Sequence, residues 1–262
     1  MIGLLGSGGM AQVYLARDLR LQVDVALKVL TIPSPVVGQR LQQEGRLQAR
    51  LQHPNVLPVT DLVEIGGYAG LVMERVRGPS LAQLLAHRKL DMVEKEYLVR
   101  GIVEGVQAAH HLGLVHRDLK PANVLIARAG QRLVPKVADF GLAKVLGDDV
   151  TSQTVSGIVM GSPAYMAPEQ IRSAKGVDAR ADIFSLGAII YEVFCGLRAF
   201  KGGSSWRVLN AVMSGGFTPP ADLGIALPRR IEAVILDCLV VNRDDRIASC
   251  EELLERLDQD GG

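Results

Sequence analysis

The stretch His116-Arg117-Asp118-Leu119-Lys120-Pro121-Ala122-Asn123 is the most informative part of this 262-residue sequence. It is polar and follows a helix-like segment over residues 98–110, so its charged side chains are expected on a loop that begins where a helix ends. Two further short motifs come after it, Asp139-Phe140-Gly141 and Ala167-Pro168-Glu169. The order of these motifs along the chain carries more weight than any one of them.

A glycine-rich run lies upstream, Leu5-Gly6-Ser7-Gly8-Gly9-Met10-Ala11-Gln12-Val13. Glycine lets backbone N–H groups approach phosphate oxygens closely, so the run is a candidate phosphate-binding loop. A glycine-rich run also serves as a plain hairpin turn, and Ala11 stands where the phosphate-binding pattern has its third glycine. Alone, this signal leaves both interpretations open.

Lys28 ends the apolar run Val25-Ala26-Leu27 on an expected strand. Burying an ammonium group is costly unless an anion accompanies it. Phosphates are one such partner, and Glu44 on the expected helix over residues 39–51 is a second. The alternative is a surface lysine whose aliphatic stem covers apolar side chains.

Together, these five elements and their order resemble the protein kinase family. The sequences of Gly8-Gly9-Met10 and of residues 14–18 are similar to those of the bacterial, eukaryote-like serine/threonine kinases. The resemblance covers essentially the whole chain. It implies an α+β, bilobal protein-kinase fold, with a small β-rich N-lobe that carries one regulatory helix and a larger α-helical C-lobe. We expect one kinase domain over residues 1–262, divided into N-lobe and hinge (1–76) and C-lobe (77–262).

The resemblance also implies a chemical role for each polar side chain of these motifs. Asp118 would orient the attacking hydroxyl and accept its proton, and Lys120 would neutralise the γ-phosphate of ATP. Asn123 and Asp139 would bind Mg²⁺, which prefers oxygen ligands. Lys28 would contact the α- and β-phosphates and pair with Glu44. The residues expected to bind ATP are Leu5, Gly6, Ser7, Gly8, Gly9, Met10, Val13, Ala26, Lys28, Met73, Glu74, Val76 and Leu125.

A further group of residues would hold the site together or regulate it: Glu44, Arg117, Phe140, Gly141, Ser162, Glu169, Asp182 and Arg246. Glu169 would pair with Arg246, and Asp182 would bond the backbone around His116. Phe140 would stack on His116, and the Ser162 hydroxyl would support Asp118 and Lys120. Gln48 departs from the pattern, because many relatives have an apolar residue four positions after the glutamate.

Lys120 and Ser162 are typical of kinases that act on serine and threonine rather than tyrosine. Arg117, beside Asp118, calls for an anion, and a phosphate group on the loop between residues 139 and 169 would supply one. Thr154 is the first candidate for this autophosphorylation and Ser156 the second; either hydroxyl could instead be an ordinary polar loop residue.

Composition excludes several other classes of protein. The net charge of +1, from 29 basic and 28 acidic residues, gives no reason to expect nucleic acid or an anionic membrane as main partner. The longest apolar stretch, residues 186–195, is far shorter than the roughly 20 residues of a membrane span. The three cysteines fit neither a zinc pattern nor a disulfide framework. We therefore expect a cytoplasmic kinase domain without a membrane segment of its own; a membrane-anchored parent protein stays open.

The function that the resemblance implies is ATP- and Mg²⁺-dependent phosphorylation of serine and threonine on protein substrates. The alternative is an ATP-binding pseudokinase that acts as a scaffold, but Lys28, Glu44, Asp118, Asn123 and Asp139 are all present. The family resemblance also suggests a homodimer formed through the N-lobe.

Overall fold

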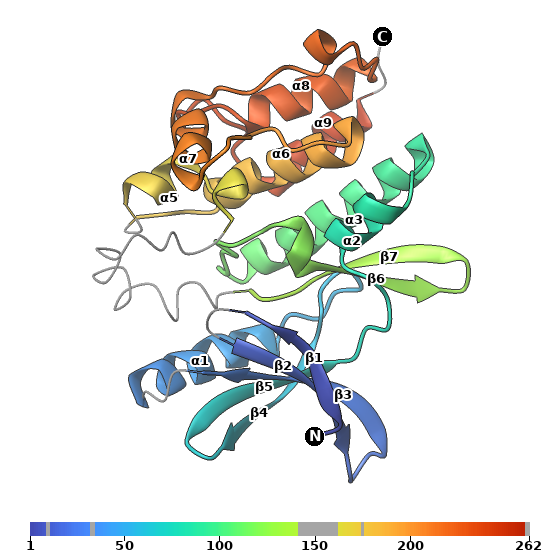
Figure 1. The fold of residues 1–262 in the computed structure, drawn as a ribbon, viewed down its shortest axis with the longest axis vertical. Coiled ribbons are helices and arrows are strands. Elements are labelled where there is room, and N and C mark those ends of the chain that lie inside the picture. The colour runs from blue at the N-terminus through green and yellow to red at the C-terminus, as the bar shows by residue number, and fades with distance from the viewer. Residues whose placement is uncertain (9–10, 32–34, 141–161, 174–175, 260–262) are drawn as a thin grey trace.

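The chain folds into a small sheet-based lobe and a larger helical lobe, as a computed structural model shows (Figure 1). The structure describes residues 1–8, 11–31, 35–140, 162–173 and 176–259, and the statements below refer to these residues. The expected α+β, bilobal architecture is confirmed.

The small lobe is an antiparallel sheet with one helix beside it (Figure 1). The strand order is β1-β2-β3-β5-β4. The strands are β1 (Gly3–Ser7), β2 (Ala11–Asp18), β3 (Val23–Leu30), β4 (Val59–Ile65) and β5 (Tyr68–Glu74), and the helix is α1 (Pro35–Gln48). The sequence predicted this helix over residues 39–51, whereas it begins four residues earlier, at Pro35, and ends three residues earlier, at Gln48.

The large lobe contains helices and one two-stranded sheet, β6 (Val124–Ala129) with β7 (Arg132–Val137). Its α-helices are α2 (Leu81–His87), α3 (Met92–His111), α5 (Pro168–Arg172), α6 (Arg180–Cys195), α7 (Ser205–Ser214), α8 (Arg229–Cys238) and α9 (Cys250–Asp258). Side-chain oxygens cap four of them, accepting a backbone hydrogen bond at the helix start: Ser80 at α2, Asp91 at α3, Ser204 at α7 and Ser249 at α9. Such capping satisfies backbone N–H groups that a helix start leaves unpaired.

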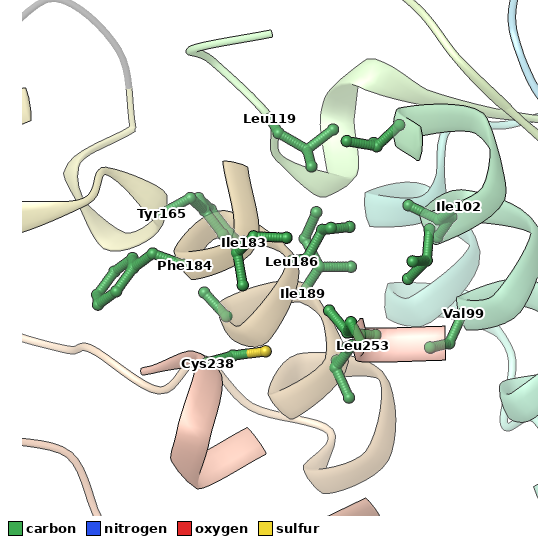
Figure 2. Packing of buried hydrophobic residues seen from close by; sticks show 14 of the residues in the cluster. Val99, Ile102, Leu119, Tyr165, Ile183, Phe184, Leu186, Ile189, Cys238 and Leu253 are labelled. Carbon is green, nitrogen blue, oxygen red and sulfur yellow. The ribbon is translucent and has the colours of Figure 1, made fainter. Parts of the chain in front are cut away.

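Helix α6 is the centre of the large-lobe core (Figure 2). Nearly all of its residues are buried, which a continuous apolar run predicts, and the helix ends at Gly196 in a left-handed conformation (φ +73°). Figure 2 shows Ile183, Leu186 and Ile189 of α6 among side chains from α3, α8 and α9. In the described part of the chain, no helix is both long enough and apolar enough to cross a bilayer.

The two lobes are joined between β5 and α2, close to Gly78. Any side chain there would collide with the large lobe, since a Cβ atom on Gly78 would lie 1.8 Å from the carbonyl oxygen of Ile126. The Ile126 N–H donates to the Pro79 carbonyl at 2.8 Å, which fixes this segment against β6. The predicted boundary between residues 76 and 77 falls in this connection and stays a prediction.

Candidate active site

One buried carboxylate on α6 holds the loop at residues 116–123 in place through hydrogen bonds. Asp182 is fully buried and accepts the N–H groups of His116 at 2.8 Å and Arg117 at 2.9 Å. His110 Nε2 lies 2.8 Å from the same carboxylate. Burial alone would raise the pKa of Asp182, but the His110 hydrogen bond, the charges of both histidines and the His116 N–H together lower it. The loop is thus fixed to the most deeply buried helix of the protein.

Within the loop, two polar side chains converge on Asp118. Lys120 Nζ lies 2.6 Å from Asp118 Oδ2, and the Asn123 amide donates to the Asp118 carbonyl at 2.8 Å and to Oδ2 at 3.2 Å. Because the Asn123 nitrogen makes both bonds, its side-chain oxygen points elsewhere and is available as a ligand. The Asp118 carboxyl group is therefore held between the Lys120 ammonium group and the Asn123 amide.

Asp139 and Phe140 lie against this loop from the end of β7. The Ala138 N–H donates to the Asn123 carbonyl at 2.8 Å, and His116 Nε2 lies 2.8 Å from the Ala138 carbonyl. The Phe140 and His116 rings lie 4.7 Å apart between centroids. Asp139 itself has a positive φ of +70°, a conformation that is uncommon for a non-glycine residue and often found at functional sites.

Lys28 reaches this region from the small lobe. Its ammonium group lies 2.7 Å from the Asp139 carboxylate, and its side chain is only 12% exposed. The ion pair with Glu44 that the sequence suggested is not formed between these two described residues; Glu44 is buried on α1. The partly buried ammonium is thus neutralised by the candidate metal-binding carboxylate rather than by the helix.

Most of the apolar residues expected around the adenine belong to one cluster, which is the small-lobe core together with Leu125 and Ala138 of the large lobe. Ala26 and Met73 are buried members of it, and Val13, Val76 and Leu125 pack against it. Leu5 lies outside this cluster and is about half exposed. The Glu74 carboxylate forms an ion pair with the Lys136 ammonium group at 3.0 Å, a contact that the sequence did not indicate.

The glycine-rich run begins in β1 and ends in β2, and these two strands pair antiparallel. Gly6 pairs with Val13, Ser7 pairs with Gln12, and the Gly8 N–H donates to the Ala11 carbonyl at 2.9 Å. A Cβ atom on Gly6 would meet nothing within 4 Å, so this part of the hairpin is open rather than packed. An open hairpin above Lys28 fits a phosphate group. Gly9, Met10, Gly141, Thr154 and Ser156 lie outside the described residues.

The residues expected to brace the site are also brought together in the large lobe. Arg246, whose side chain is fully buried, donates to both oxygens of Glu169, at 2.8 and 3.0 Å. Ser162 and Lys120 line the same pocket, but the expected hydrogen bond from the Ser162 hydroxyl to Asp118 or Lys120 is not formed in the described structure. Arg117 has a positive φ of +66°, and its Nε atom is buried without a partner among the described residues.

Two further contacts at the site were not expected from the sequence. Gln48 is buried on α1 and donates its amide hydrogen to the Phe140 carbonyl. Gln170 donates a hydrogen bond to the Arg117 carbonyl at 2.8 Å, which connects α5 to the loop at residues 116–123. The sequence hinted at the Gln48 contact only by a polar residue at a position where many relatives have an apolar one. Nothing in the sequence indicated the Gln170 contact.

The donor set suits ATP with a divalent metal ion. An aspartate and an asparagine oxygen are appropriate ligands for Mg²⁺, which usually completes its shell with water and phosphate oxygens. In the described residues, no group of three or more His, Cys, Asp or Glu side chains could hold a metal by itself.

Comparisons with known proteins agree with this geometry. The chain matches the family described as "Protein kinase domain" over residues 1–256. It is 36% identical to serine/threonine-protein kinase PknB of Mycobacterium tuberculosis over 260 residues, which is 95% of this chain and 41% of that protein. It is 34% identical to serine/threonine-protein kinase pkn2 of Myxococcus xanthus, covering 97% of this chain and 31% of that protein. The chain thus spans less than half of these relatives.

A solved structure has the same fold. The crystal structure of Rad53 in complex with AMP-PNP superimposes with a TM-score of 0.80 over 98% of this chain and 63% of that one, at 23% identity. The similarity to bacterial, eukaryote-like kinases that the motifs suggested is confirmed. The family uses ATP and a divalent metal ion, and this chain belongs to the protein kinase family.

Proposed function

We propose that this chain transfers the γ-phosphoryl group of ATP to serine and threonine hydroxyls of proteins. The observation that carries the proposal is the arrangement around Asp118, whose carboxylate is held by Lys120 and Asn123 on a loop anchored to α6. Phosphoryl transfer needs positioning and charge neutralisation more than covalent chemistry from the protein. The arrangement supplies both.

Each residue then has a definite task. Asp118 accepts a hydrogen bond from the substrate hydroxyl and takes its proton as the new O–P bond forms. Lys120 neutralises charge on the transferred group, and Lys28 holds the phosphates that remain on the nucleotide. Asn123 and Asp139 are the residues that would hold Mg²⁺, whose charge stabilises the phosphate oxygens. The apolar cluster of Val13, Ala26, Met73, Val76 and Leu125 would receive the adenine, with backbone groups of Glu74 and Val76 at its edge.

The test is incorporation of labelled phosphate from ATP into the protein itself and into a basic protein acceptor, with Mg²⁺ present. Label on serine and threonine, lost in both Asp118→Asn and Lys28→Met, supports the proposal. Mapping that label also tests Thr154 and Ser156 as sites of autophosphorylation. A folded protein that binds ATP without labelling anything would instead be a pseudokinase scaffold.

A homodimer through the small lobe is part of the proposal. Four apolar side chains there are well exposed: Ile2, Leu4, Leu19 and Leu21. Sedimentation should show mass that increases with protein concentration, and Leu19→Asp with Leu21→Asp should abolish the increase. Val93→Asp is the matched control, because Val93 is equally exposed (78%) but lies on α3 of the large lobe. Monomers at every concentration would refute the dimer.

We also propose that the domain works in the cytoplasm, where ATP is available. Cys195, Cys238 and Cys250 are free thiols in the structure, and burial raises the pKa of all three. Buried thiols of raised pKa are unreactive, which suits a reducing compartment.

A further inference from the structure

A pocket of about 480 Å³ lies beside the candidate active site in the large lobe. Its walls come from α2, from the segment between α2 and α3, from the end of α6, and from the loop residues Lys120 and Pro121, with Ser162 at its edge. Lys120 belongs to both places, because its ammonium group also lies 2.6 Å from Asp118. A group bound in this pocket is therefore a close neighbour of the reacting hydroxyl.

The pocket has an excess of positive charge. Its lining contains the cations Arg88, Lys89, Lys95, Lys120 and Arg198. Glu192 is the one carboxylate among the residues that line it. Arg88 pairs with Glu94 and Lys120 pairs with Asp118, so five positive charges stand against three negative ones, an excess of two.

Glu192 already accepts a hydrogen bond within the pocket. The Tyr165 hydroxyl donates to it, and burial followed by this hydrogen bond raises the pKa of Tyr165, which keeps the phenol protonated as a donor. The guanidinium carbon of Arg198 lies 6.0 Å from the centre of the Tyr165 ring. Arg198 forms no ion pair with Glu192 among the described residues, so its positive charge still counts toward the pocket.

Three cations remain without a carboxylate partner among the described residues: Lys89, Lys95 and Arg198. Lys95 is half-buried, and its ammonium group lies 3.3 Å from the Phe194 carbonyl and 5.9 Å from the centre of the Phe194 ring. These contacts orient the ammonium group without cancelling its charge. In a partly enclosed pocket such charges are less screened than on an open surface.

From this charge excess beside the reaction centre, we propose that the pocket binds an anionic side chain of the protein substrate, either a carboxylate or a phosphorylated residue. The inference rests on the proposed function and names the substrate class that this site selects. Because an extended chain advances about 3.3 Å per residue, the anionic residue lies within roughly four residues of the serine or threonine that is phosphorylated. Substrates with arginine or lysine at that position are disfavoured.

The test uses short peptides with one acceptor threonine in an uncharged background. A single residue on either side of the acceptor is replaced in turn by glutamate, glutamine, phosphoserine or lysine. Each peptide is measured by kcat/KM with the whole chain, and by fluorescence anisotropy as the Kd for the Asp118→Asn protein. Glutamine is the uncharged match for glutamate, and phosphoserine separates a primed substrate from a simply acidic one.

At one position we expect kcat/KM to be about fivefold to tenfold higher for glutamate or phosphoserine than for glutamine, and lower for lysine. Lys95→Met and Arg198→Gln should each reduce this ratio, and together they should bring it near one, while kcat/KM for the glutamine peptide stays unchanged. Arg132→Gln, on the exposed β6–β7 hairpin, is the control and should leave the ratio as it is.

The two ideas fail in different ways. If no peptide is phosphorylated, the proposed function is refuted, and the anisotropy ratio between the glutamate and glutamine peptides still decides the inference about the pocket. If glutamate and glutamine peptides are used and bound equally at every position, or lysine is preferred, the inference is overturned although the kinase activity stands. A ratio that the Lys95 and Arg198 variants do not change would also overturn it.

Discussion

Replacing Arg246 by methionine should destabilise the protein far more than any exposed ion-pair change. Its guanidinium group is completely buried and donates to both oxygens of Glu169, to the Arg180 carbonyl at 2.6 Å and to the Val240 carbonyl at 3.1 Å. Methionine keeps most of the apolar volume but leaves the Glu169 carboxylate and these carbonyls without a donor. Breaking a buried pair on one side costs about 3–5 kcal/mol in the free energy of unfolding.

The charge of the partner can be removed separately. Glu169→Gln keeps the shape of the side chain and one acceptor oxygen, so we expect a smaller loss of about 2–3 kcal/mol. The double variant should lose less than the sum of the two single losses, because it leaves no unpaired carboxylate. The coupling energy should be about 1–3 kcal/mol. Urea unfolding followed by far-ultraviolet circular dichroism gives all four free energies.

Arg243→Met is the matched control, because it lies only three residues away and also forms an ion pair. Arg243 is 39% exposed, and its nitrogen lies 3.4 Å from Asp178. Exposed pairs contribute at most about 1 kcal/mol. If Arg246→Met costs no more than Arg243→Met, the buried pair does not stabilise the large lobe and the reasoning is wrong.

Three further outcomes follow from the geometry. Gln48→Leu leaves the Phe140 carbonyl without its buried donor and should cost about 1–3 kcal/mol by urea unfolding; an unchanged midpoint would show that the bond contributes nothing. Because the pKa of Asp182 is lowered in the folded protein, its carboxylate stabilises the fold near neutral pH, and this stabilisation is lost as the pH falls below 3.8, the ordinary pKa of the group. Asp182→Asn should therefore be less stable near neutral pH, and its melting temperature should fall less steeply than that of the original protein as the pH is lowered. Parallel curves of melting temperature against pH would contradict this. Gly78→Ala should lower the melting temperature sharply, because its Cβ would lie 1.8 Å from the Ile126 carbonyl oxygen, and an unaffected melting temperature would mean that the lobe connection yields easily.

The fold was predictable because its signals are local. Residues 116–123, 139–141 and 167–169 are short runs whose order is typical of one family, and the continuous apolar run of α6 predicts a buried helix. Helix ends were less accurate, as α1 shows, since its amphipathic pattern continues past the point where the backbone leaves the helix at Gln48.

The partners of individual side chains were harder to predict. Lys28 had two candidate anions, Glu44 and the phosphates, yet in the structure its ammonium group pairs with Asp139, 111 positions along the chain. A distance of that kind depends on how two lobes meet, which no periodicity encodes. The same holds for the pocket, since Lys95 and Arg198 are unremarkable in the sequence and gain meaning only where α3 approaches the end of α6.

The ion pair between Lys28 and Asp139 has a consequence for the order in which ligands bind. A divalent ion that arrives alone would have to compete with the Lys28 ammonium group, which lies 2.7 Å from the Asp139 carboxylate proposed as its ligand. A nucleotide offers that ammonium another set of anions and so frees the carboxylate. If Asp139 holds the metal as proposed, metal and nucleotide would be thermodynamically linked: each would raise the affinity for the other by the same factor.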